Sequence, residues 1–165
     1  MGSFEILVAR TESDIATARE LFVEYAAALQ VDLCFQDFSR ELETLPQMYG
    51  RTGGCLLVAR TNDEPAGCVA VRALREHICE MKRLYVRPGF RGRSLGRQLA
   101  LEIIRSAHRL GYRRMVLDTL ASLEAANALY LSLGFRPGEP YNVNPLPGVR
   151  YWELEIADFR AQISV

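Results

Sequence analysis

The sequence lacks several features by which whole classes of protein are recognised. Its twenty basic and twenty acidic residues cancel, so no excess of charge favours nucleic acid or a membrane surface as a partner. No apolar run approaches the roughly 18 residues of a membrane span. The N-terminus lacks the basic and apolar segments of a signal peptide. We therefore expect a cytoplasmic protein with neither nucleic acid nor membrane as partner.

Cysteine and histidine are too few and too scattered to predict a metal site. The cysteines form no CxxC pair and match no zinc spacing, and the two histidines are isolated. Three of the cysteines lie in apolar, strand-like runs, so we expect buried free thiols and no bound metal. The four are Cys34, Cys55, Cys68 and Cys79.

The length and composition of the chain suit one compact domain. It has 165 residues, of which 49% are hydrophobic and 24% charged, as in ordinary globular proteins. We find no internal repeat, low-complexity stretch or linker. The whole chain, 1–165, is predicted to form a single domain.

Hydrophobic periodicity predicts a mixed α/β fold. Strands are expected over 4–9, 55–60, 67–72, 79–86, 114–118 and 151–156, with a late strand beginning at Phe135. One helix is expected to begin at Thr11 or Ser13, a short one to cover 39–45 and end at Pro46, and two more to cover 95–110 and 123–133. The strands between 55 and 86 should form an antiparallel meander, and 79–118 a strand–helix–strand crossover.

The segment that carries chemistry runs from Lys82 to Arg97, as strand, turn and helix start. A turn of small residues lets several backbone N–H groups point at one spot, and the helix dipole adds partial positive charge there. Arg91, Arg93 and Arg97 strengthen this anion site, which suits a phosphate or pyrophosphate. The glycine spacing fits neither a P-loop nor a dinucleotide fingerprint. A basic turn that merely links strand to helix remains an open alternative.

Two motifs point to a family. Arg91-Gly92-Arg93-Ser94-Leu95-Gly96, after Leu84-Tyr85-Val86, resembles the acetyl-CoA motif Q/R-x-x-G-x-G/A of the GCN5-related N-acetyltransferase (GNAT) superfamily. The family's second signature is matched by the ten residues from Ala126 to Phe135. The resemblance covers about 79–135, and the order of elements extends it across the chain. It implies a central, mostly antiparallel sheet, splayed between two strands and flanked by about four helices.

The sequence departs from the family pattern at two positions. Ser94 stands where the family usually has glycine, and we expect binding to survive if the local φ is negative. Leu123 stands where many members carry an asparagine that contacts the cofactor. Asn127, one helical turn later, is the candidate to take over that contact.

The resemblance also implies a reaction. The pyrophosphate of acetyl-CoA would lie on Arg91–Arg97, and its pantetheine arm along Leu84–Val86, where a backbone N–H would polarise the thioester carbonyl. An amine would attack directly, and Tyr130 would protonate the departing sulfur. Glu80 is the candidate general base, directly or through water. The alternatives are a tyrosine that only packs and a glutamate that faces solvent or pairs with Lys82 or Arg83.

The acceptor is not specified by the sequence. Tyr141, Asn142 and Asn144, in a Pro/Asn-rich loop, are candidates for the acceptor wall, and an ordinary turn is the alternative. The acceptor is expected to be a small-molecule or peptide amine, and a homodimer is left open. Two rival functions are a CoA-binding sensor without turnover and a nucleic-acid binder that uses the basic patch, which zero net charge disfavours.

Overall fold

The computed structural model describes residues 2–33, 37–50 and 53–159. Within them a seven-stranded sheet runs in the order β1-β2-β3-β4-β5-β7-β6. Neighbouring strands are antiparallel except for β4 and β5, which are parallel. The mixed α/β class and the β2–β3–β4 meander are therefore confirmed. The strands are β1 (Glu5–Val8), β2 (Cys55–Thr61), β3 (Glu64–Arg75), β4 (Ile78–Val86), β5 (Arg114–Leu120), β6 (Arg136–Pro137) and β7 (Val149–Glu155).

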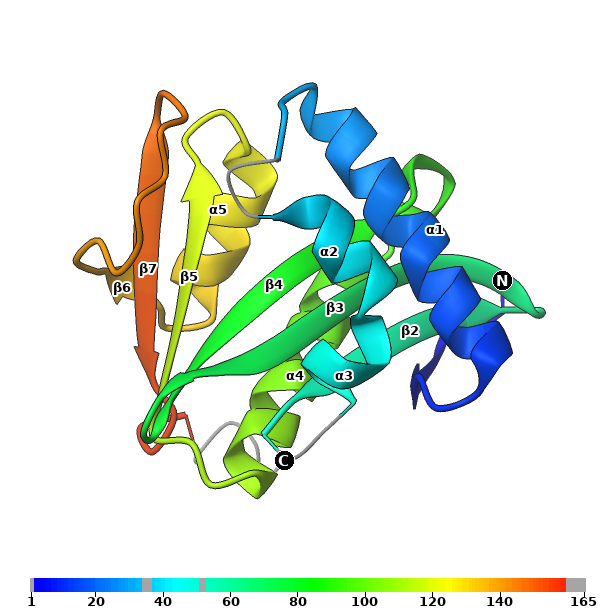
Figure 1. The fold of residues 1–165 in the computed structure, drawn as a ribbon, viewed down its shortest axis with the longest axis horizontal. Coiled ribbons are helices and arrows are strands. Elements are labelled where there is room, and N and C mark those ends of the chain that lie inside the picture. The colour runs from blue at the N-terminus through cyan, green and yellow to red at the C-terminus, as the bar shows by residue number, and fades with distance from the viewer. Residues whose placement is uncertain (1, 34–36, 51–52, 160–165) are drawn as a thin grey trace.

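Helices cover both faces of this sheet. Figure 1 shows α1, α2 and α3 across one face and α4 across the other. The alternation of side chains along the strands supplies both cores, because Leu57 and Ala59 of β2 face α4 while Leu56 and Val58 face α1 and α3. The helices are α1 (Glu12–Leu29), α2 (Phe38–Glu43), α3 (Leu45–Tyr49), α4 (Leu95–Arg109) and α5 (Glu124–Ser132).

Local sequence explains where the first helices begin. The Thr11 hydroxyl accepts a hydrogen bond from the Asp14 N–H at 3.1 Å, and the Asp14 carboxylate accepts from the Thr11 N–H at 3.2 Å, forming a capping box. Thr11 is thus the cap of α1. The expectation that Pro46 ends a helix is wrong. Pro46 lies in the first turn of α3, where its missing N–H needs no partner.

The strand boundaries differ from the expected ones, most clearly at the β2–β3 turn and after α5. The β2–β3 turn is tighter than expected, because Asn62 and Asp63 both adopt positive φ (50° and 65°) and Thr61 already pairs with Glu64. The strand expected to begin at Phe135 consists of Arg136 and Pro137 alone. The residues from 138 to 148 form the long loop before β7. Asn142 and Asn144 of this loop donate hydrogen bonds to Asp118 of β5.

Candidate active site

The parallel strands β4 and β5 separate after three residue pairs. Their ladder ends at Glu80 and Val116. Beyond it, the register of β3 with β4 shifts between Cys68 and Ala70, and Arg83 adopts a positive φ of 60°. This bulge bends β4 and re-aims its later residues. The sheet therefore opens between the two strands.

A buried ion pair holds the bulge in its left-handed conformation. The Arg83 guanidinium donates to both carboxylate oxygens of Glu41 at 2.8 Å, and the two residues are 6% and 1% exposed. Phe38 and Tyr25 flank the guanidinium. Burial alone raises the pKa of Glu41, but Arg83 outweighs it and holds the pKa below its ordinary value. A positive φ at arginine is sustained because several strong contacts determine it.

A turn and a helix start lie at the far end of β4. Gly92 has a φ of 78°, and a Cβ there would meet no atom within 4 Å. Ser94 precedes α4 with a φ of 63°. The condition of a negative φ at Ser94 is therefore not met, and serine occupies the left-handed conformation in which glycine is favoured. The first N–H groups of α4 lack intrahelical partners, so this end of the helix is suited to an anion, as the sequence predicted.

A cleft of about 580 Å³ joins this turn to the opening in the sheet. We call it the α4 cleft. It brings together eight of the eleven predicted cofactor-binding residues. Tyr25, Ala28 and Leu29 of α1 complete its wall, together with residues between Ser122 and Leu129. No local motif marks the α1 residues, because only the packing of α1 brings them here. The eight residues are Leu84, Tyr85, Val86, Arg91, Gly92, Ser94, Leu95 and Gly96.

The other three predicted cofactor-binding residues do not line the cleft. The Arg93 guanidinium lies 4.5 Å from the Phe4 ring centroid and donates to the Gly2 carbonyl. Arg97 donates to the Ser132 hydroxyl at 3.2 Å.

The side chain of Asn127, like those of Arg93 and Arg97, makes its contacts within the protein. Its Nδ2 donates to the carbonyls of Leu120 and Leu123, and its Oδ1 accepts from the Trp152 indole. Every polar atom of this 7% exposed side chain is thus engaged within the protein. It therefore joins α5 to β5 and β7.

A small inner pocket adjoins the cleft between the separated strands. It has a volume of about 40 Å³ and shares Tyr25, Leu84, Leu123 and Ala126 with the α4 cleft. Tyr130 of α5 lines it and is 6% exposed, and burial raises the pKa of its phenol. The structure thus places Tyr130 beside the point where the strands part.

Asp118 is the carboxylate that lines the inner pocket, and sequence reasoning missed it. The amides of Asn142 and Asn144 donate to its Oδ2 at 2.8 and 3.1 Å. Among the described residues, no hydrogen bond reaches its Oδ1. The strand expected over 114–118 ended at Asp118. A polar residue at the carboxyl end of a buried strand is a candidate functional residue, and this position could have been recognised by that signal.

Glu80 lies outside the inner pocket, and of its expected surroundings only the ion pair with Lys82 is found. It is 1% exposed rather than facing solvent, and its main cation is Arg72, whose Nε lies 2.9 Å from Oε1. Tyr141 donates to Oε2 at 2.6 Å, and the Lys82 ammonium lies 4.0 Å from Oε1. The loop that carries Tyr141, Asn142 and Asn144 is therefore bound to carboxylates of β4 and β5.

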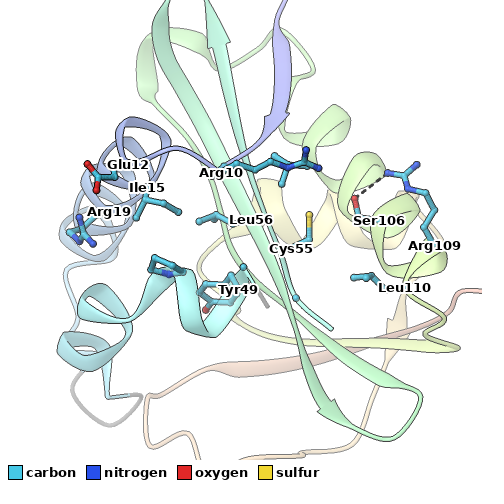
Figure 2. Close-up of a pocket in the computed structure, with 15 residues that line it drawn as sticks. Arg10, Glu12, Ile15, Arg19, Tyr49, Cys55, Leu56, Ser106, Arg109 and Leu110 are labelled. Atoms are coloured by element: carbon cyan, nitrogen blue, oxygen red, sulfur yellow. Dashed lines mark hydrogen bonds between the residues drawn. The ribbon is translucent and has the colours of Figure 1, made fainter. Parts of the chain in front are cut away.

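A larger cavity of about 920 Å³ lies elsewhere (Figure 2). It is bounded by the start of α1, α3, the start of β2 and the end of α4, with Arg10, Tyr49, Cys55 and Arg109 among its lining residues. The fifteen residues of α4 span about 22 Å, so this cavity lies at the opposite end of the helix from the anion-binding turn. None of the predicted site residues lines it, so we assign the site to the smaller cleft.

In the described part of the chain, no helix is both long and apolar enough to cross a bilayer. Among the same residues, no three histidine, cysteine or acidic side chains are grouped so that they could hold a metal ion.

Comparison with known proteins gives a consistent result. The model of the acetyltransferase (GNAT) family matches residues 18–135. The chain is 43% identical to an uncharacterized N-acetyltransferase of Schizosaccharomyces pombe, over 94% of this chain and 97% of that one. It is 33% identical to N-acetylaspartate synthetase of Danio rerio, over 68% of this chain and 40% of that protein.

Solved structures agree in fold. A GNAT acetyltransferase of Staphylococcus aureus superposes with a TM-score of 0.78 at 19% identity, over 93% of this chain and 99% of that one. A protein of Salmonella typhimurium, solved with its cofactor acetyl-CoA, gives a TM-score of 0.66 at 22% identity, over 93% and 94%.

Proposed function

Because this chain belongs to the GNAT family and is an acetyl-CoA-dependent N-acetyltransferase, we propose that it holds acetyl-CoA in the α4 cleft and acetylates a small primary amine in the inner pocket. One observation carries this proposal. The anion-binding turn, the bent half of β4 and Tyr130 lie along one continuous opening in the sheet. Acetyl-CoA, in which the pantetheine arm joins the pyrophosphate to the thioester, matches that order.

The cleft fits the proposed co-substrate in shape and charge. The open space at Gly92 lets a pyrophosphate approach the backbone, and the N–H groups at the start of α4 supply donors. Arg91 is the cationic side chain that lines the cleft. The pantetheine arm would lie along Leu84–Val86, where β4 has left β5. A backbone N–H of this segment would polarise the thioester carbonyl.

Tyr130 is the proposed general acid. As the amine nitrogen bonds to the acetyl carbon, the carbon–sulfur bond breaks and the sulfur leaves as a thiolate. The raised pKa of Tyr130 keeps its hydroxyl protonated at neutral pH, so a proton is available to the sulfur. The nitrogen loses its remaining extra proton as the amide forms, and that proton passes through water to restore the Tyr130 hydroxyl.

Asp118 is the proposed base in place of Glu80. An acceptor arrives at neutral pH as an ammonium and must lose a proton before it attacks. Asp118 lines the inner pocket, whereas Glu80 lies outside it and both Glu80 oxygens already accept hydrogen bonds. The proton therefore passes from the ammonium to Oδ1 of Asp118, and from there to water.

An amino acid is the first acceptor to test. The support is the name of one relative, N-acetylaspartate synthetase, and the presence of the carboxylate Asp118 and the cation Lys82 around the inner pocket. The cytoplasm is the proposed location, because Cys55, Cys68 and Cys79 are free thiols, as expected in a reducing compartment.

The test is an acceptor screen with purified protein and acetyl-CoA. Aspartate, glutamate, asparagine, a polyamine and a short peptide are compared by release of free thiol, and the acetylated product is identified by mass spectrometry. At least one amine should release thiol in proportion to product. Gly92→Asp, which places a carboxylate at the pyrophosphate site, is the inactive control. Tight acetyl-CoA binding without turnover of any amine would contradict the proposed acetylation.

A further inference from the structure

Three charged side chains meet on the face of the sheet beneath α2 and α3. Arg72 of β3 stands directly opposite Glu80 of β4, and Lys82 follows two residues later on the same face. The Arg72 Nε lies 2.9 Å and the Lys82 Nζ 4.0 Å from the same oxygen of Glu80. Two cations thus share one oxygen of Glu80.

The neighbouring Arg83 pairs with a different carboxylate. Its guanidinium is paired with both oxygens of Glu41, and both residues are buried. Glu80 is therefore shared by Arg72 and Lys82, and Lys82 also lines the inner pocket, as Asp118 does.

Arg72 is fixed at one end and open at the other. Its Nε is held by Glu80, which is 1% exposed and is held in turn by the hydroxyl of Tyr141. In the described part of the chain, its terminal nitrogens make one contact, from Nη1 to the Met48 sulfur at 3.9 Å. The side chain is 34% exposed, so these terminal N–H groups are accessible. A guanidinium presented in this way matches the two oxygens of a carboxylate.

The position suits an acceptor that reaches from the reaction centre. Lys82 and Leu84 are two residues apart on β4, about 7 Å along a strand, and Leu84 belongs to the segment proposed to hold the thioester. Arg72 adjoins Lys82 through their shared oxygen on Glu80. An acceptor whose amine lies beside Leu84 and whose acid group is directed past Lys82 would approach the guanidinium of Arg72.

We propose that Arg72 binds a carboxylate of the acceptor and makes the enzyme select amines that bear one. This inference rests on the proposed acetylation of a small amine in the inner pocket. Arg72 is a specificity-determining residue in this scheme, and Glu80 with Tyr141 positions its guanidinium. A site built to pair with a carboxylate rejects the uncharged isostere, because the cation then stays without its anion.

The experiment compares isosteric acceptors. kcat/KM is measured for aspartate, for asparagine, which lacks the side-chain acid, and for aspartic acid α-amide, which lacks the α-carboxylate. For the wild type, kcat/KM for aspartate should exceed that for one of the two amides at least tenfold. The carboxylate that is missing from that amide is then the one that Arg72 binds.

The test variant is Arg72→Lys, which keeps a cation for Glu80 but loses the paired N–H groups of the guanidinium. The control variant is Arg75→Lys, at an exposed position of the same strand. Arg72→Lys should reduce the ratio of kcat/KM for aspartate to that for the discriminated amide by about tenfold or more. The reduction should come from a higher KM for aspartate, with kcat nearly unchanged. Arg75→Lys should leave the preference as it is. Melting curves and acetyl-CoA binding verify that each variant folds, and Arg72→Gln replaces Arg72→Lys if that variant does not.

Two results would overturn the inference. Equal kcat/KM for aspartate and both amides in wild type would show that no carboxylate is selected. An equal loss for all three acceptors in the Arg72 variants would make Arg72 structural only. Both results leave acetyl transfer itself intact, since turnover is still observed. The absence of thiol release with every amine would instead refute the proposed function, and with it the role of Arg72.

Discussion

At the scale of single residues, Tyr130 is the side chain whose proposed role can be isolated most cleanly. Removing its hydroxyl in Tyr130→Phe leaves the ring packed against Phe135, so stability should change little. General acid catalysis is worth about 10²–10⁴-fold, and kcat should fall within that range while acetyl-CoA affinity stays near normal. Steady-state kinetics with an acceptor from the screen measures this. A loss below threefold would indicate that Tyr130 only packs.

The assignment of the base can be tested with a matched pair of variants. Above the pKa of the amine the acceptor arrives deprotonated, so a base matters mainly at lower pH. Asp118→Asn should therefore lower kcat most at low pH, whereas Glu80→Gln should retain the wild-type profile of kcat against pH, with acetyl-CoA affinity unchanged in both. The reverse result, with the low-pH loss in Glu80→Gln, would assign the base to Glu80 as the sequence suggested.

Ser94 carries a backbone conformation that its side chain disfavours. The left-handed region costs a residue other than glycine about 1–2 kcal/mol, and a glycine also gains entropy in the unfolded chain. Ser94→Gly should thus raise the free energy of unfolding by up to about 1 kcal/mol, with acetyl-CoA affinity equal or higher. Denaturant titration measures this. Ser39→Gly, at an exposed position of α2, is the control and should destabilise the protein instead.

At the scale of elements, the bulge of β4 depends on the pair that Arg83 forms with Glu41. Arg83 holds the folded-state pKa of Glu41 below its unfolded value near 4.5. The stabilisation is therefore fully present above that pH and is lost as the pH falls through the lower, folded value. The pair that shapes the opening between β4 and β5 should thus weaken in acid.

Glu41→Gln tests this dependence. It leaves a buried guanidinium without its anion, which costs about 3–5 kcal/mol of unfolding free energy at neutral pH. Below pH 4.5 its stability should vary less with pH than that of wild type. Glu43→Gln, at an exposed position of the same helix, should behave as wild type. Urea titrations from pH 3 to pH 7 provide the measurement, and parallel curves for wild type and Glu41→Gln would show that the pair does not hold the bulge.

At the scale of the whole molecule, the cofactor should stabilise the fold. A ligand that binds only the folded state adds about 2.7 kcal/mol at a hundred times its Kd. Acetyl-CoA should therefore raise the Tm and bind at one site per chain. Gly92→Asp should abolish the shift, because a carboxylate then occupies the approach of the pyrophosphate. Arg91→Ala should reduce it less, because the backbone donors remain. Calorimetry and thermal melts that detect no binding by the wild type would contradict the proposed site.

Local sequence was sufficient to predict the features that depend on backbone geometry. The alternation of apolar residues identified the strands of the meander, the candidate caps Thr11 and Ser13 placed the start of α1 within two residues, and the small residues around Gly92 predicted the turn that we propose for the pyrophosphate. The fold and the proposed cofactor cleft follow from these features, because hydrogen-bonding N–H groups and strand faces are fixed within a few residues of chain. Pro46 was misplaced because proline is tolerated at the first turn of a helix as well as after the last.

Side-chain partners, in contrast, were decided by the tertiary structure. Asn127 has the right residue type for a cofactor contact, but Trp152, 25 residues later, occupies its amide. Glu80 is paired with Arg72 across the sheet and with Tyr141, 61 residues away, and neither contact is encoded by spacing. Asp118 faces the inner pocket because β4 bends away from β5. A polar side chain binds whichever donor the fold brings within about 3 Å, and that choice is made only when distant segments pack together.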